Sequence, residues 1–206
     1  MIKLIIFDVG GTLVGSPDIF EYMAKIIDEK KVEFYYKYLK KRFFYYKKKN
    51  KFFSVREILE KISIDAKEKF KCRDISKMVY KIYEDVYIKN SFLLEHTMDL
   101  LNLLKEKNIK MVILSDADEE ILIKQLKKLK IYDYFDEIFV SSKIQAYKPS
   151  FKLIDFLRKN LEFKPNTTVL VGDSINDKKT ASSLNVKFIN VDNIYKLIFL
   201  VKKNEI

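Results

Sequence analysis

Three short, almost entirely apolar runs, each ending in an acidic residue, constrain the fold more than any other feature of the sequence. They are KLIIFD at 3–8, KMVILSD at 110–116 and TVLVGD at 168–173. Runs of this kind are typical of parallel strands that are buried on both faces. Two weaker runs, EIFVSS at 137–142 and KFINVD at 187–192, continue the pattern. The sequence therefore predicts a parallel sheet at the centre of the fold.

The segments between these runs have the spacing of amphipathic helices. Apolar residues recur every three or four positions in 98–108, 119–130, 150–160 and 177–185. Strands that alternate with helices predict an α/β domain in which helices cover a parallel sheet. We expect a Rossmann-like, three-layer architecture.

Residues 15–92 interrupt this alternation. No strong strand pattern occurs there, whereas IFEYMAKIIDEKK and SVREILEKIS have helical periodicity. We therefore predict a core domain made of 1–14 and 93–206, and a helical domain inserted as 15–92.

Polar residues stand at the ends of the predicted strands. Asp8, Ser115 and Asp173 each follow an apolar run directly or end one. In open sheets of this kind, ligands bind beyond the carboxyl ends of the strands. This edge is the candidate site.

Four segments occur in order along the chain: DVGGT with Asp8, the strand end at Ser115, YKP with Lys148, and GDSIND with Asp173 and Asp177. Together they resemble the haloacid dehalogenase superfamily, a large group of mostly phosphate-ester hydrolases. Each motif alone is short, but four in order at the expected strand and helix ends form a specific signal. The resemblance covers 1–13 and about 93–206. The insert matches the family's helical cap in position and helical character only.

The resemblance implies a role for each of these residues. Asp8 would attack phosphorus and form an aspartyl-phosphate, which divides one difficult step into two. Backbone N–H groups of Gly10, Gly11 and Thr12 would hold the phosphoryl oxygens. The Ser115 hydroxyl would donate to another oxygen, and Lys148 would neutralise charge on the phosphoryl group and on Asp8.

The same resemblance implies a magnesium ion. Its ligands would be the carboxylates of Asp8, Asp173 and Asp177 and the backbone carbonyl of Gly10, which are oxygen donors that Mg²⁺ prefers. Purely structural roles are the alternatives. Asp173 could cap the helix that begins near residue 176, and Asp177 could be a solvated acid in its first turn. Ser115 could likewise cap a helix, and Lys148 could be one of many surface lysines.

Gly10 departs from the family pattern. Phosphatases of the family usually carry a second Asp there, which protonates the leaving group and then activates water. General acid–base help of this kind typically contributes about 10²–10⁴-fold. Asp116 or Asp118, in SDAD, could substitute, although surface or capping roles are simpler. A bound water or a cap residue could also supply the proton, or the enzyme could act on good leaving groups or turn over slowly.

Two other enzyme classes share parts of the pattern. The 2-haloacid dehalogenases lack the second Asp and need no metal, and SSKIQAYKP resembles their lysine segment, so a metal-independent dehalogenase stays an alternative. Sugar kinases and actin-like ATPases also use a DxGGT segment, but they need a second glycine-rich segment. This chain has four glycines and no second cluster.

Composition limits the environment and the partners. The net charge is +11, with 40 basic and 29 acidic residues, which suits a small anionic phosphorylated substrate. A single cysteine, Cys72, excludes an internal disulfide, and His96 would be its only imidazole partner. No apolar run reaches the roughly 18 residues of a membrane span, and MIKLIIF is interpreted as a strand rather than a signal peptide. We expect a cytoplasmic monomer or homodimer.

The centre of the insert is unusually basic and aromatic. FYYKYLKKRFFYYKKKNKFF, at 34–53, holds eight basic residues, ten aromatic residues and no acid. A cap helix with one apolar face and lysines around it is the favoured interpretation. A binding or regulatory protein that contacts nucleic acid through this stretch is the alternative of another class.

Overall fold

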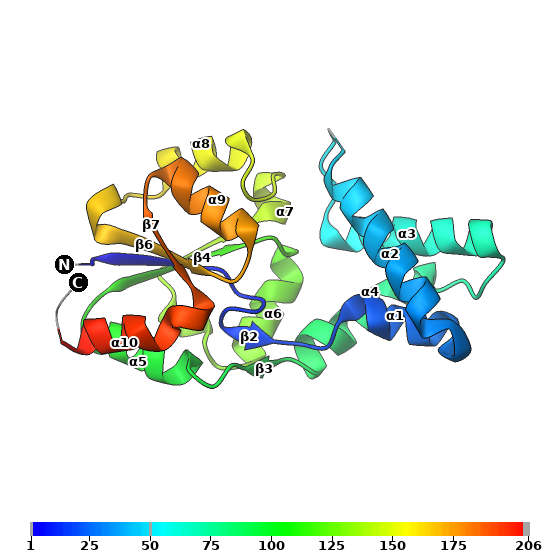
Figure 1. Ribbon diagram of the computed structural model, residues 1–206, viewed down its shortest axis with the longest axis horizontal. Coiled ribbons are helices and arrows are strands. Elements are labelled where there is room, and N and C mark those ends of the chain that lie inside the picture. The colour runs from blue at the N-terminus through cyan, green and yellow to red at the C-terminus, as the bar shows by residue number, and fades with distance from the viewer. Residues whose placement is uncertain (1, 50, 204–206) are drawn as a thin grey trace. The chain divides into compact units, whose positions relative to one another are not determined.

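The computed structural model describes residues 2–49 and 51–203, and its contacts divide the chain into two compact units (Figure 1). The first unit runs up to Gly15 and continues through Phe92–Asp116 and Leu126–Ile206. The second unit consists of Ser16–Ser91 and Ala117–Gln125. The chain thus leaves and re-enters the first unit within one residue of the predicted insertion points. The grouping of 117–125 with the helical unit was not predicted.

The first unit is built on a five-stranded, wholly parallel sheet. Its strands lie in the order β5-β4-β1-β6-β7. They are β1 (Leu4–Phe7), β4 (Lys110–Ser115), β5 (Glu137–Val140), β6 (Thr168–Gly172) and β7 (Lys187–Asn190). The sheet confirms the predicted α/β, Rossmann-like fold. The central strand β1 is buried on both faces, as its uniformly apolar sequence predicts.

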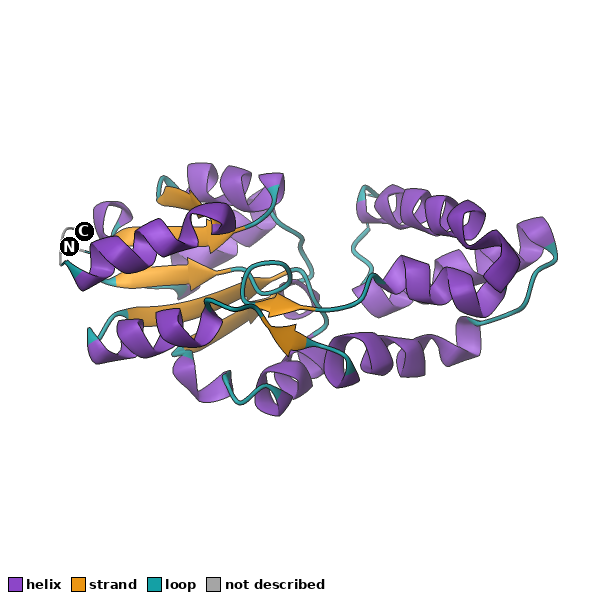
Figure 2. Ribbon diagram, turned by 60° about the horizontal axis from the view of Figure 1, so that its bottom comes forward, coloured by secondary structure: helices purple, strands orange, loops and turns teal. Residues whose placement is uncertain are grey.

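Helices lie on both faces of this sheet (Figures 1 and 2). Those of the first unit are α5 (Thr97–Glu106), α7 (Ser141–Ile144), α8 (Phe151–Asn160), α9 (Ile175–Leu184) and α10 (Ile194–Lys202); α6 (Glu119–Lys128) is divided between the two units. One face packs against α8 and α9 through an apolar cluster that includes Ile6, Leu153 and Leu184. Burial of each large side chain there contributes roughly 1.5–3 kcal/mol.

Two predicted strands end earlier than expected. β5 stops at Val140, because Ser141 and Ser142 begin the short helix α7. β7 stops at Asn190, and 191–193 form a 3₁₀ turn. Two very short strands, β2 (Val14–Gly15) and β3 (Phe92–Leu93), pair antiparallel where the insert begins and ends.

The second unit is helical, as the periodicity of the insert predicts. It contains α1 (Ile19–Ile27), α2 (Val32–Lys47), α3 (Val55–Phe70) and α4 (Val79–Glu84), followed by a π-helical turn at Asp85–Lys89. α2 packs against both α1 and α3. No helix in the described part of the chain is long and apolar enough to cross a membrane.

The N-terminus of α3 explains why 117–125 group with the helical unit. The carboxylate of Asp118 accepts the N–H groups of Val55 (3.1 Å) and Arg56 (2.8 Å), and Ser54 Oγ accepts that of Glu57 (3.2 Å). Three N–H groups that a helix leaves unpaired are thereby satisfied. Asp118 is therefore a structural residue of the helical unit.

Candidate active site

Asp8 stands directly after β1, where a tight turn begins. Its N–H donates to the carbonyl of Val171 at 2.9 Å, and its side chain is buried. In the turn, the carbonyl of Val9 accepts the N–H groups of Thr12, Leu13 and Val14 at 2.9–3.2 Å. This carbonyl holds the turn closed beneath the carboxylate of Asp8.

Two glycines let the other carboxylates approach Asp8. Gly11 has φ of +77°, and a Cβ there would overlap the carboxylate of Asp173. At Gly172, a Cβ would meet the Cβ and Cγ of Asp177 at 2.5 and 2.6 Å. The glycines of both motifs therefore make room for acidic side chains.

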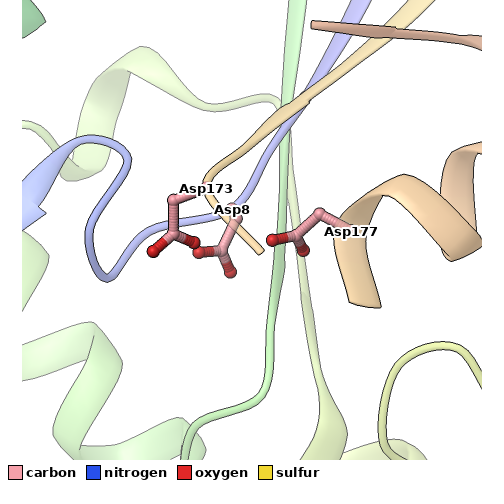
Figure 3. Close-up of side chains that lie close together, drawn as sticks. All are labelled: Asp8, Asp173 and Asp177. Carbon is pink, nitrogen blue, oxygen red and sulfur yellow. The ribbon is translucent and has the colours of Figure 1, made fainter. Parts of the chain in front are cut away.

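The three aspartates converge (Figure 3). Asp8, Asp173 and Asp177 each offer a carboxylate oxygen, and these oxygens lie within 4.8 Å of one another. Asp173 is exposed and follows β6, whereas Asp177 lies in the first turn of α9 and is only 1% exposed. Residues from two strand ends and one helix thus form a single acidic cluster.

Lys148 reaches this cluster from the loop before α8. Its Nζ donates to Asp8 Oδ1 and Asp177 Oδ1, both at 2.6 Å, and to the carbonyl of Leu114 at 3.2 Å. Lys148 is 6% exposed. A buried lysine paired with two buried carboxylates is not one more surface lysine, so that structural alternative is wrong.

Asp116 holds the loop that carries Lys148. Its Oδ1 accepts the backbone N–H of Lys148 at 3.0 Å and the Ser141 hydroxyl at 2.6 Å. This oxygen is therefore engaged in positioning the chain. The geometry of Asp116 favours a role in supporting the Lys148 loop rather than as a replacement for the acid missing at position 10. Asp118 caps the N-terminus of α3.

Burial and neighbouring charges shift the pKa values of three groups in this cluster. Burial, assisted by the charges of Asp177 and Asp173, raises the pKa of Asp8 to about 6, although Lys148 opposes the rise. Burial and then Asp177 also raise the pKa of Asp173. Burial would lower the pKa of Lys148, but Asp8, Asp116 and Asp177 outweigh it and raise the pKa, so Lys148 stays cationic. Three acids facing one ammonium favour a further cation.

The donor set fits Mg²⁺. Its three carboxylates lie together, and the backbone carbonyl of Gly10, the fourth ligand that the resemblance implies, accepts no hydrogen bond from the described residues. All four are hard oxygen ligands, and Asp173 is open to solvent, which leaves room for the waters that Mg²⁺ retains. The metal ligands implied by the sequence are therefore chemically compatible with the geometry.

The phosphate-binding turn differs from the prediction in two of its three residues. The N–H of Gly11 donates to Val14 O (2.9 Å), and that of Thr12 donates to Val9 O (3.2 Å), so neither is available to a phosphate in this conformation. The N–H groups of Val9 and Gly10 have no partner among the described residues. Val9 and Gly10 are therefore the residues of this turn whose N–H groups are open to a ligand, and of these two the sequence predicted only Gly10.

The remaining predicted residues occupy the same edge of the sheet. Ser115 ends β4, the strand beside β1, and is 5% exposed. It cannot be the N-cap of α6, which begins at Glu119. His96 Nε2 lies 2.8 Å from the carbonyl of Thr12, so this buried histidine braces the turn.

The structural alternatives for the last motif are also decided. Ser174, not Asp173, is the N-cap of α9, because its Oγ accepts the N–H of Asp177 at 3.2 Å. Asp177 does lie in the first helical turn, but it is buried and paired with Lys148 rather than solvated.

A parallel sheet with acidic side chains and a buried lysine at its carboxyl edge defines an α/β enzyme whose site lies beyond the strand ends. The sequence model of the haloacid dehalogenase-like hydrolases matches residues 5–191, and the chain belongs to this family.

Known relatives fall into two groups. A phosphoglycolate phosphatase of Shigella boydii is 24% identical over 111 residues, which are 54% of this chain and 44% of that protein, so the match spans less than half of the relative. A putative hydrolase of the family from Bacillus subtilis, solved with magnesium, superposes with a TM-score of 0.75 at 16% identity over 98% of this chain and 99% of that one. The L-2-haloacid dehalogenase of Xanthobacter autotrophicus superposes with a TM-score of 0.69 at 15% identity over 91% and 76%. The structural likenesses establish the fold.

Proposed function

We propose that this hydrolase is a Mg²⁺-dependent phosphatase that acts on a small phosphorylated metabolite through a phospho-Asp8 intermediate. The observation that carries the proposal is the convergence of three carboxylates within 4.8 Å of one another, two of them paired with buried Lys148. A divalent cation is complementary to this arrangement of charge, and the cation together with Lys148 would offset the repulsion between the carboxylates and a phosphoryl group. The match to phosphoglycolate phosphatases supports the same reaction class.

Each site residue has its own role in the proposed reaction. Lys148 holds Asp8 Oδ1, which leaves Oδ2 as the attacking atom. Oδ2 forms a bond to phosphorus while the bond to the leaving oxygen breaks; water then attacks phosphorus and releases phosphate and free Asp8. The N–H groups of Val9 and Gly10, the Ser115 hydroxyl and Lys148 surround the phosphoryl oxygens. Bound Mg²⁺ would supply Lewis-acid stabilisation of that group.

Hydrolysis of an activated aryl phosphate tests the proposal most directly, because an aryl leaving group needs little protonation. We expect wild type to release the phenol only with Mg²⁺ and Asp8→Asn to be inactive. Asp155→Asn is the matched control, because Asp155 is outside the site and pairs with Lys159 on α8. Activity that survives Asp8→Asn, or none in wild type with Mg²⁺, refutes the phosphatase proposal.

A metal-independent 2-haloacid dehalogenase is the second candidate, favoured by the fold shared with the Xanthobacter enzyme. In that reaction Asp8 would displace halide from carbon, and water would hydrolyse the resulting ester. Halide release from 2-chloropropionate in the presence of EDTA, lost in Asp8→Asn, would establish it. We favour the phosphatase because a dehalogenase has no use for an acidic cluster that attracts a cation.

A further inference from the structure

Helix α2 has two faces, and folding of the helical unit explains one of them fully and the other only in part. The inner face carries Tyr35 and Leu39, which are buried, and packs against α1 and α3 (Figure 1). Arg42 and Tyr46 extend this face, and both contact the carboxylate of Asp65 on α3. The inner aromatic residues therefore belong to the core of the unit, as the cap-helix interpretation predicts.

The outer face is different, because it presents large aromatic side chains to solvent. Phe34, Phe44 and Tyr45 are 49%, 49% and 46% exposed. Phe34 also contacts Phe70 of α3 edge to face, with ring centroids 4.9 Å apart. The cations of Arg42 and Lys49 lie 4.6 and 4.5 Å from the ring centre of Tyr45. At about 100° per residue, they lie within one third of the helix circumference together with three exposed lysines. We call this set the outer stripe: Phe34, Lys37, Lys41, Phe44, Tyr45 and Lys48.

The charge of the outer stripe is poorly compensated. Lys37 pairs with Glu33 at 2.8 Å, but the side chains of Lys41 and Lys48 have no ion-pair or hydrogen-bond partner among the described residues. No acidic residue occurs from 34 to 53. The stripe thus combines exposed rings with unpaired positive charge over one continuous helix face.

We propose that the outer stripe binds single-stranded nucleic acid, whose bases stack on Phe34, Phe44 and Tyr45 while Lys41 and Lys48 contact phosphates. Proteins that bind single-stranded nucleic acid without sequence preference combine aromatic side chains, on which bases stack, with basic side chains that contact the phosphates. A helix that lies on a membrane instead separates a wide apolar face from its basic face. The centre of a protein–protein interface is depleted of lysine.

Fluorescence anisotropy with a labelled oligomer of twelve deoxythymidines tests this inference at about 50 and 200 mM salt. We expect Tyr45→Ala to weaken binding about 5- to 150-fold, the range for loss of one stacked base, and Tyr45→Phe to leave it unchanged. Lys41→Gln with Lys48→Gln should reduce the slope of log K against log salt by about 1.4, because each phosphate contact contributes about 0.7.

Matched controls separate the stripe from the general positive charge of the chain. Lys130→Gln with Lys164→Gln removes two charges from the first unit, and Phe151→Ala removes a ring that is 83% exposed. Both should bind the oligomer as wild type does. Asp8→Asn should also bind the oligomer as wild type does, because Asp8 is not part of the outer stripe. Loss of the phosphatase proposal would therefore leave this inference standing.

Three results would overturn the inference. The first is no binding of wild type at low salt, and the second is equal weakening by the control and stripe variants. The third is that the oligomer is not bound and the stripe substitutions instead abolish binding to phosphatidylserine vesicles or self-association in sedimentation. The stripe would then contact a membrane or a second copy of the chain. Circular dichroism of each variant checks that the overall helix content is unchanged.

Discussion

Replacement of Gly10 by Asp should restore the proton transfer that the sequence lacks. A Cβ at Gly10 would meet no atom within 4 Å, and its φ lies outside the left-handed region, so an aspartate can be accommodated. Because general acid–base help typically contributes about 10²–10⁴-fold, kcat/KM for alkyl phosphates should rise by up to this factor. At 1.36 kcal/mol per tenfold, that is about 2.7–5.4 kcal/mol of transition-state stabilisation.

The dependence on the leaving group identifies the cause. The assay is kcat/KM for an alkyl, a phenyl and a nitrophenyl phosphate in wild type, Gly10→Asp and Gly10→Asn. We expect the gain to be largest for the alkyl ester, small for the nitrophenyl ester and absent in Gly10→Asn, which has the same shape but no acidic proton. An equal gain for all three esters, or a gain in Gly10→Asn, would refute the reasoning.

Three further substitutions test how the site is held. Lys148→Met leaves Asp8 and Asp177 buried without their cation, so without Mg²⁺ the free energy of unfolding, from urea titration, should fall by about 3–5 kcal/mol at neutral pH. The loss should shrink below the Asp8 pKa of about 6, where a neutral carboxyl needs no cation; a pH-independent loss contradicts this. Asp116→Ala should lower kcat for aryl phosphate about 10²-fold by releasing the Lys148 loop, whereas Asp116→Asn, which keeps the accepting oxygen, should retain most activity; equal losses would disprove positioning. Gly172→Ala drives a methyl into Asp177 and should lower the thermal midpoint, consistent with about 1–3 kcal/mol of overpacking, while Gly10→Ala should be neutral; a neutral Gly172→Ala contradicts the geometry.

The parallel core was predictable because local composition alone marks each buried strand. β1, β4 and β6 are almost uniformly apolar, and their burial on both faces requires this. Features that depend on distant partners were not predictable. Asp118 caps α3 from 63 positions away in sequence, and β2 and β3 are two residues each, too short for any pattern.

The turn that contains Gly10, Gly11 and Thr12 was also only partly predictable, because its internal hydrogen bonds leave no mark in the sequence. The motif places Gly10, Gly11 and Thr12 beside Asp8, but it cannot tell which N–H groups the turn itself consumes. Gly11 is required for its positive φ and for the space it leaves Asp173, while its N–H closes the turn on Val14. The motif therefore places Gly11 in this turn but does not reveal what its N–H group does there.

Asp177 shows why structural and chemical explanations of one residue need not compete. Its Oδ2 accepts the N–H of Ser174 at 3.0 Å, which completes a capping box at the start of α9, while its Oδ1 accepts Lys148 Nζ at 2.6 Å. Capping fixes the carboxylate at the N-terminus of the helix, where the dipole stabilises its negative charge. The helix start therefore orients the acid that pairs with Lys148 and that the proposed metal would use, and this acid in turn stabilises the helix start. The short spacing of GDSIND agrees with this double use, because it puts Asp177 at the third helical position, from which it reaches both Ser174 and Lys148.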